Sequence, residues 1–260
     1  VTLAGPLKLP PLEVDLAIAP DGAVSSTSLR GPDGLSGKLT PKSASEMEFD
    51  VVAHSFTVPI VPDMSLSGFA MKGTATRNGM RIESWGGSSL DGGVSGSANV
   101  RWTSGNWMID GVMTVRGINA AVFAPALLSE GKAEGTGRFS FSDADPMSFL
   151  SKGRIEGTYS VHKGVLGSFD LSRAITTGGR QVGGRTPFTA LSGQGVFDKG
   201  AVALRNVSFG AGALNAGASA DISPEGNLSG RIVADVRTPS QTLRATLNLG
   251  GTVKDPQVKN

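Results

Sequence analysis

The sequence contains no cysteine, one tyrosine and three tryptophans in 260 residues. The absence of cysteine excludes a disulfide framework, a cysteine-ligated zinc site and a cysteine nucleophile. Aromatic residues make up only 6% of the chain, so few large rings are available to interlock in a core. We therefore expect a thin core of alanine, valine, leucine and glycine, which suits flat sheets whose backbones approach closely.

Long apolar runs and runs of like charge are also missing. The longest uncharged stretch with a helical pattern, 118–128, has 11 residues, whereas a helix needs about 20 to span a membrane. The first residues, VTLAGP at 1–6, lack the basic and apolar regions of a signal peptide, so we expect a mature product or an excised piece. No five like charges stand together, so we expect no nucleic-acid partner.

Specific catalytic motifs are absent as well. The chain has no G-x-S-x-G nucleophile elbow, no G-x-G-x-x-G loop and no Walker-type G-K-[ST]. Its two histidines, His54 and His162, lie within alternating segments and are expected on strand surfaces. Glu46, Glu48 and Asp50 share one strand face at period two, which is typical of a solvated face and not of a calcium loop. We expect no enzyme, no metal and no cofactor, although a carboxylate pair for glycoside cleavage stays open.

Glycine and period-two alternation are what the sequence does have. Glycine accounts for 37 of 260 residues, about twice its usual share of ~7%. Clean alternation of apolar and polar residues predicts antiparallel strands with one apolar and one wet face. About a dozen strands are expected, at 12–18, 49–53, 69–76, 80–82, 94–102, 107–116, 135–142, 154–161, 201–209, 213–222, 229–237 and 242–249. The fold class is therefore all-β.

Turn and cap signals punctuate these strands. Asn78-Gly79 predicts a hairpin between 69–76 and 80–82. Short helices are expected at 146–151, capped by Asp145, and at 171–176, capped by Asp170. A third segment, 119–128, has a helical pattern of two to three turns that Pro125 interrupts. We expect these helices to plug gaps between strands and not to form a layer.

Glycines also occupy positions inside the expected strands, at Gly73, Gly111, Gly157 and Gly217. Glycine weakens a strand, so its repeated use suggests a sheet that bends or a backbone that something approaches closely. An open sheet of a dozen strands usually curls or splits into a two-sheet sandwich. A curled open sheet and a two-sheet sandwich imply different functions.

A series of short motifs follows residue 152 in a defined order. It comprises KGVLG at 163–167, FDL at 169–171, TPFTAL at 186–191, ASADI at 218–222 and GGTVKDP at 250–256. In this order they resemble the C-terminal region of the AsmA family of bacterial envelope proteins. Upstream, LDGGVSG at 90–96 resembles a strand turn of the same family, and 117–128 resembles its gap-covering helix.

The resemblance implies one β-groove domain over 1–260. It divides into divergent N-terminal strands at 1–63, an AsmA-like repeat at 64–151 and an AsmA-like C-terminal repeat at 152–260. In this repeating β-groove architecture, shared with bridge-like lipid transfer proteins, a long curved antiparallel sheet forms an open groove with a few short helices.

The resemblance also implies a function. Members of the family lie in the periplasm of Gram-negative bacteria, are tethered to the inner membrane, and contribute to phospholipid traffic and outer-membrane integrity. The implied partners are phospholipid acyl chains, membranes reached through an N-terminal anchor outside this sequence, and envelope proteins.

An apolar strand face suits such a cargo, since each buried methylene contributes about 0.8 kcal/mol. We expect the concave side to be lined by Ile155, Tyr159, Val161, Ile232, Val236, Leu243, Leu247 and Leu249. Two interpretations of these residues stay open. They line a lipid groove, or they form the ordinary core of a structural or protein-interaction module in which two sheets pack face to face.

Overall fold

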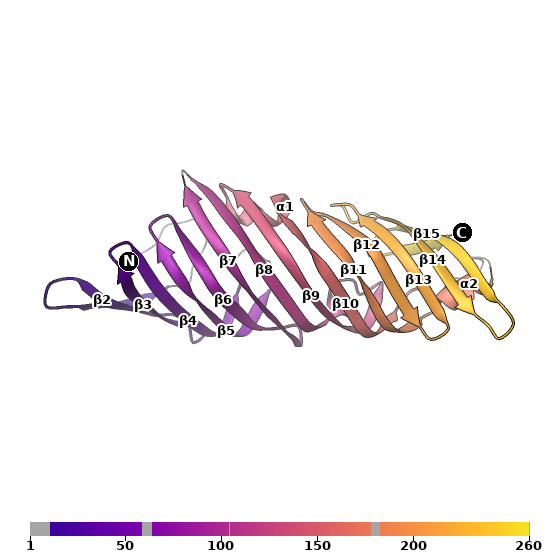
Figure 1. The fold of residues 1–260 in the computed structure, drawn as a ribbon, viewed down its shortest axis with the longest axis horizontal. Helices are drawn as coiled ribbons and strands as arrows, with labels where there is room; N and C mark the ends of the chain where they lie inside the picture. Colours follow the sequence, from indigo (N-terminus) through magenta and orange to yellow (C-terminus); the bar gives the residue numbers. More distant parts are fainter. Residues whose placement is uncertain (1–10, 59–63, 104, 178–182, 260) are drawn as a thin grey trace. The chain divides into compact units, whose positions relative to one another are not determined.

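The computed structural model of the chain describes residues 11–58, 64–103, 105–177 and 183–259. Within these ranges, sixteen strands form one antiparallel sheet whose spatial order follows the sequence order from β1 to β16 (Figure 1). The two ends of the sheet do not pair with each other, so the sheet is open. The expected all-β class is confirmed, and one open sheet is present where a two-sheet sandwich was the alternative.

The chain divides into two compact units. The first unit comprises Val1–Thr114 with Arg138–Arg154, and the second comprises Val115–Gly137 with Ile155–Asn260. Strands β8 (Asn106–Asn119) and β9 (Leu128–Asp143) contribute residues to both. Each unit is described by itself below.

The first unit holds the first seven strands together with two short helical segments. The strands are β1 (Glu13–Ile18), β2 (Val24–Arg30), β3 (Ser36–Ser43), β4 (Glu46–Thr57), β5 (Ser65–Thr76), β6 (Gly79–Ser89) and β7 (Gly92–Thr103). The helical segments are η2 (Pro146–Ser148) and α1 (Phe149–Lys152).

The second unit holds the remaining strands, a 3-10 turn and a second α-helix. The strands are β10 (Arg154–Leu166), whose first residue belongs to the first unit, β11 (Thr186–Asp198), β12 (Ala201–Ala211), β13 (Leu214–Ile222), β14 (Leu228–Arg237), β15 (Thr242–Gly251) and β16 (Pro256–Lys259). The helical elements are η1 (Ala120–Val122) and α2 (Leu171–Thr176).

All the expected strands are present, but the estimate of about a dozen is too low. Four strands, β2, β3, β11 and β16, lie where no strand was expected. The hairpin at Asn78 is confirmed, with Thr76 paired to Gly79, so Gly79 already belongs to β6.

Two of the three expected helices are confirmed with their caps. The Asp145 side chain accepts a hydrogen bond from the Met147 amide at 3.0 Å, and the Asp170 side chain accepts one from the Arg173 amide at 2.9 Å. The third expectation, two to three turns over 119–128, is wrong in extent. Only the three residues of η1 are helical, because Pro125 interrupts the pattern and the chain enters β9 at Leu128.

Glycine inside the strands permits close backbone contact, as expected. A β-carbon at Gly157 would overlap the carbonyl oxygen of Thr136 on β9, and one at Gly73 would overlap that of Arg81 on β6. Gly217 differs, since a β-carbon there would meet its nearest neighbour, the Val207 carbonyl oxygen, at 3.8 Å. Close approach is therefore a property of particular glycines and not of all of them.

The core of the first unit includes a stack of aromatic rings. Phe141 stacks on both Phe139 and Phe149, with ring centroids 5.7 Å apart in each pair. Phe149 belongs to α1 and is 1% exposed, so the short helix packs its aromatic ring against β9. Lys152 Nζ lies 2.5 Å from Asp143 Oδ2, and this hydrogen bond lowers the pKa of the Asp143 carboxyl.

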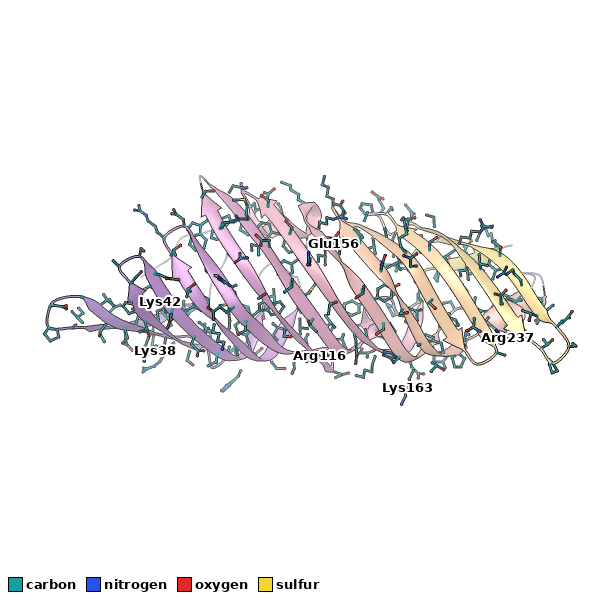
Figure 2. All side chains as sticks on the ribbon, viewed as in Figure 1. Lys38, Lys42, Arg116, Glu156, Lys163 and Arg237 are labelled. Carbon is teal, nitrogen blue, oxygen red and sulfur yellow. The ribbon has the colours of Figure 1, made fainter. Side chains whose placement is uncertain are left out.

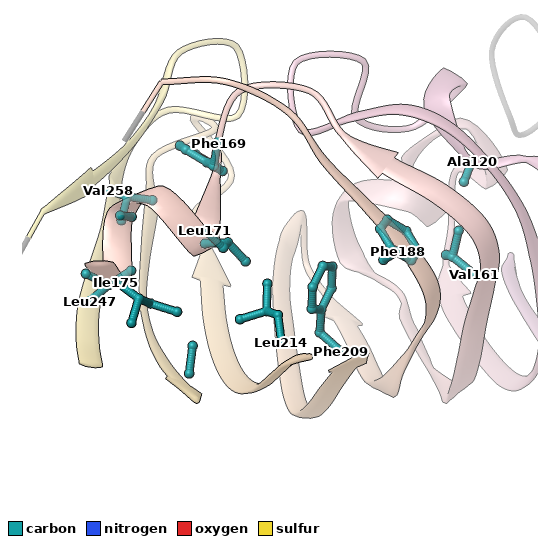
Figure 3. Packing of buried hydrophobic residues seen from close by; sticks show 12 residues of the cluster. Ala120, Val161, Phe169, Leu171, Ile175, Phe188, Phe209, Leu214, Leu247 and Val258 are labelled. Carbon is teal, nitrogen blue, oxygen red and sulfur yellow. The ribbon is translucent and has the colours of Figure 1, made fainter. Parts of the chain in front are cut away.

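The core of the second unit is a cluster shared by α2 and the strands (Figure 3). Helix α2 buries Leu171, Ala174 and Ile175 and lies against β14 and β15. Each strand from β10 to β16 contributes one buried residue: Val161, Phe188, Phe209, Leu214, Ala234, Leu247 and Val258. We call the strand face that carries this cluster the inner face of the second unit.

Candidate functional site: the inner face of the second unit

Strand register defines which residues belong to the inner face. Leu214 on β13 pairs with Val236 on β14, which pairs with Leu243 on β15. Two residues further along each strand, the inner face carries Ala216, Ala234 and Ala245 in the same alignment. Because side chains alternate along a strand, the apolar residues of β13–β15 gather on this one face.

The outer face of the same strands is polar. Asp235 on β14 pairs with Arg244 on β15, and Arg244 Nε donates a hydrogen bond of 2.8 Å to Asp235 Oδ1. This hydrogen bond holds the pKa of the Asp235 carboxyl below its usual value. Arg205 and Asp221 form a similar pair on β12 and β13, with 2.6 Å between Nη2 and Oδ1. Opposite charges therefore neutralise each other on the outer face.

As the alternation and the register assign them, the inner face carries no charged side chain among the described residues of 128–137 in β9 and of β10–β16. Its polar side chains in that part of the chain are two hydroxyl residues, Thr186 on β11 and Tyr159 on β10. Many of its apolar residues are only half-buried, among them Leu204, Ala218 and Ile222. The face is thus apolar, uncharged and partly open to solvent.

The eight residues predicted to line a groove all lie on this face, but in two groups. Six of them lie in the buried cluster or pack against it: Val161, Ile232, Val236, Leu243, Leu247 and Leu249. The other two, Ile155 and Tyr159, share the face of Val161 on β10 but lie outside the cluster and are half-buried. The part of the face that α2 leaves uncovered therefore includes Ile155 and Tyr159.

Thr186 holds the segment that leads into α2. Its hydroxyl accepts a hydrogen bond from the Leu171 amide at 3.0 Å and donates one to the Phe169 carbonyl oxygen at 2.6 Å. The Thr186 side chain is buried, so these two backbone groups depend on it for their partners. The contact joins β11 to α2 across 15 residues of sequence.

Replacement of Thr186 by valine tests this contact. Valine keeps the shape but leaves the buried Leu171 amide and Phe169 carbonyl without that partner, so the free energy of unfolding should fall by roughly 1–3 kcal/mol. Urea denaturation followed by circular dichroism measures the change, and Thr186→Ser, which keeps the hydroxyl, serves as the control. Equal stability of the valine variant and the wild type would show that the hydroxyl does not hold α2.

Glycines of β9 and β11 are the neighbours of Tyr159 on the inner face. A β-carbon at Gly193 on β11 would lie 2.9 Å from the Tyr159 hydroxyl oxygen, and one at Gly195 would lie 3.8 Å from its ring. On β9, Gly135 is the neighbour, since a β-carbon there would lie 3.5 Å from Tyr159 Cα. Partial burial raises the pKa of the Tyr159 phenol above its ordinary value, so the phenol is neutral at pH 7.

These glycines are the site residues that sequence reasoning did not assign. Gly193 and Gly195 form a Gly-x-Gly pair inside β11, next to a register shift in the pairing with β12 at which β12 has the extra residue. The sequence signal for their role is that glycine recurs at period two on both strands beside Tyr159. This signal can be interpreted only after the structure shows that the strands are neighbours.

The two histidines and the acidic side chains of β4 lie on strand surfaces of their own units. His162 is exposed on β10, where its Nε2 lies 3.2 Å from Ser160 Oγ, and His54 is exposed on β4, as expected for strand surfaces. Lys42 Nζ lies 4.0 Å from Glu46 and 3.8 Å from Glu48, which is the solvated face expected there. No three metal-ligating side chains come together in the described residues.

Two hollows among the described residues of the first unit have charged side chains in their linings. One of about 540 Å³ is lined by residues of β5–β8, including Arg81, Arg101 and Asp110. The other, of about 280 Å³, is lined by both signs of charge, including Lys38, Glu48 and further residues of β3–β6. Figure 2 labels Lys38, which belongs to β3. Arg101 Nη2 already lies 3.1 Å from Asp110 Oδ1. The charges in these hollows largely neutralise one another, so neither hollow points to a charged ligand.

Comparison with known proteins does not assign the chain to a family. No family model, curated protein or solved structure matches the chain. Among the helices that the structure describes, none has the length and apolarity needed to cross a membrane. The resemblance to the AsmA family stays a prediction from the sequence.

Proposed function

We propose that the inner face of the second unit binds the hydrocarbon tails of lipids, and that the chain is a lipid-binding or lipid-transfer protein without catalytic activity. One observation carries the proposal. The inner face is an uncharged apolar surface over several adjacent strands, and its residues outside the buried cluster, including Ile155 and Tyr159, are only half-buried.

The expected energetics favour retention of a tail. Burial of about a dozen methylenes at about 0.8 kcal/mol each contributes on the order of 10 kcal/mol, an upper figure if one side of the tail stays wet. Loss of freedom on binding opposes this contribution. The remainder holds a tail without a covalent or ionic tether, and a charged headgroup stays in water beyond the apolar face.

The resemblance to the AsmA family extends the proposal to a setting. In it, the chain lies in the periplasm of a Gram-negative bacterium as part of a protein tethered to the inner membrane. Its cargo is phospholipid that moves between the inner and outer membranes, and loss of the protein weakens the outer membrane. No cofactor and no nucleic acid takes part.

A structural or protein-interaction module is the second candidate, and one observation favours it. Helix α2 covers β14 and β15, so that six of the eight predicted lining residues lie in or against an ordinary buried cluster. If the rest of the inner face binds nothing, the sheet serves as a scaffold whose strands and edges contact envelope proteins.

Extraction of small molecules from the purified protein distinguishes lipid binding from a scaffold role. We expect mass spectrometry to find co-purified phospholipid, and a bound fluorescent fatty acid to be protected from aqueous quenchers. Ile155→Asn, which places an amide on the inner face, should reduce the retained lipid several-fold, whereas Thr158→Asn on the outer face of the same strand should leave it unchanged. Absence of phospholipid together with an unprotected fatty acid would reject lipid binding in favour of the scaffold.

A further inference from the structure

Tyr159 is the one tyrosine of the chain, and its hydroxyl lies on an apolar face without a hydrogen-bond partner among the described residues. No hydrogen bond joins its oxygen to a described residue, and burial alone accounts for the raised pKa of the phenol. No fully buried side-chain oxygen or nitrogen in the described residues lacks a partner, so the Tyr159 oxygen is one that solvent reaches. The inner face thus presents one hydrogen-bond donor that is open to a ligand.

Glycines of the neighbouring strands make room for Tyr159 itself. A β-carbon at Gly193 on β11 would meet the Tyr159 hydroxyl oxygen at 2.9 Å, and Gly135 on β9 lies beside the Tyr159 backbone. Ile155 lies four residues away on the same face of β10, next to Gly137 of β9, where a β-carbon would meet Ile155 Cγ2 at 3.8 Å. A hydrocarbon tail that lies along the inner face over Ile155 therefore reaches the Tyr159 hydroxyl, which is open to solvent.

The chemistry of the site selects the class of acceptor. A phenol that is neutral at pH 7 donates one hydrogen bond and supplies no charge. The inner face of β9–β16 holds no lysine, arginine or histidine among its described residues, so a carboxylate or phosphate would lie there without a counter-charge. A neutral carbonyl oxygen joined to a hydrocarbon tail satisfies the donor without that cost.

We infer that the Tyr159 hydroxyl donates a hydrogen bond to the ester carbonyl oxygen of a bound acyl lipid, whose tail lies along the inner face over Ile155. Tyr159 then sets the position of the ester along the inner face and selects acyl esters over plain hydrocarbons. This inference rests on the proposed function, and it adds the polar contact that apolar burial by itself does not supply.

Two neutral probes of similar length separate the hydrogen bond from apolar burial. Methyl hexadecanoate carries an ester carbonyl and heptadecane does not, and each displaces a fluorescent fatty acid from the 260-residue protein. One neutral hydrogen bond corresponds to an affinity difference of about 3- to 10-fold. We expect Tyr159→Phe to weaken binding of methyl hexadecanoate by that factor and to leave binding of heptadecane unchanged.

The possible outcomes separate this inference from the proposed function. If Tyr159→Phe binds the ester as tightly as the wild type does, the hydrogen bond is rejected and lipid binding stands. If the variant loses both probes equally, Tyr159 acts by packing and the inference is again rejected. If the wild type binds neither probe, both the inference and the proposed function fail.

The single tyrosine also provides a direct spectroscopic readout. Absorbance at 295 nm against pH follows ionisation of Tyr159 alone, because the chain has no other tyrosine. A carbonyl oxygen that accepts a hydrogen bond from the phenol O–H stabilises the neutral phenol, so bound methyl hexadecanoate should raise the pKa of Tyr159 more than bound heptadecane does. Equal titration with the two probes contradicts the inference.

Discussion

Leu247→Ala is expected to lower the free energy of unfolding by about 2–5 kcal/mol. Leu247 is 0% exposed, and its strand neighbour on the inner face is Ile232. It belongs to the same buried cluster as Leu171 and Ile175 of α2, which covers its strand. Removal of its side chain therefore leaves a cavity in the cluster between α2 and the sheet.

The neighbouring position supplies the control for this change. Asn248 is exposed on the outer face of β15, so Asn248→Ala should change the free energy of unfolding by less than about 0.5 kcal/mol. Urea denaturation followed by far-ultraviolet circular dichroism compares the two variants with the wild type. A loss below about 1 kcal/mol for Leu247→Ala would show that α2 does not close over this part of the sheet.

Gly157→Ala is the second change with a large expected effect. A β-carbon at this position would overlap the Thr136 carbonyl oxygen and lie 2.7 Å from Gly137 Cα, both of which are backbone atoms of β9. Since backbone in a paired strand cannot rotate away as a side chain does, β9 and β10 have to separate locally. We expect the free energy of unfolding to fall by about 1–3 kcal/mol, the range for overpacking.

Gly217 offers a matched control in another strand of the same unit. Its β-carbon would meet the Val207 carbonyl oxygen at 3.8 Å, an ordinary contact, and its backbone does not require a positive φ. Gly217→Ala should therefore leave stability unchanged or raise it by about 0.4–1 kcal/mol through the unfolded state. Chemical denaturation of both variants provides the measurement, and equal losses would argue against close strand approach as the reason for glycine at 157.

Several features of the fold were predictable because they depend on neighbouring residues. In β15, Leu243 and Leu247 alternate with Arg244 and Asn248, so the apolar and polar faces are evident before any partner strand is known. The cap at Asp170 is equally local, since the carboxylate binds an amide three residues away. Such short-range patterns predicted the strands, the helix positions and the face to which each residue belongs.

The missed strands show where local patterns fail. Strands β2 and β3, VSSTSLR and SGKLTPKS, contain too few apolar residues to alternate clearly. In β11, Phe188 belongs to the buried cluster and Leu191 packs against it, although the two are three residues apart. Period two therefore breaks between them, and a search for strict alternation overlooks the strand.

The candidate site was predictable in part for the same reason. Alternation placed Ile155 and Tyr159 on one face of β10, and the register of β14 and β15 places Ile232 and Leu247 side by side on the inner face. It did not separate the residues under α2 from those beside the glycines of β9 and β11. Lipid binding at the uncovered part stays a proposal until the extraction and probe experiments are done.

The sequence by itself determined the all-β class, the apolar and polar sides of most strands, the absence of specific catalytic motifs and the caps of two short helices. Only the tertiary structure decided that the sheet stays open, that α2 folds back over β14 and β15, and that Tyr159 lies between glycines of two other strands. The physical reason is the range of the interactions involved. Alternation and capping act over two to four residues, whereas burial and close approach depend on strands that the chain brings together from distant positions.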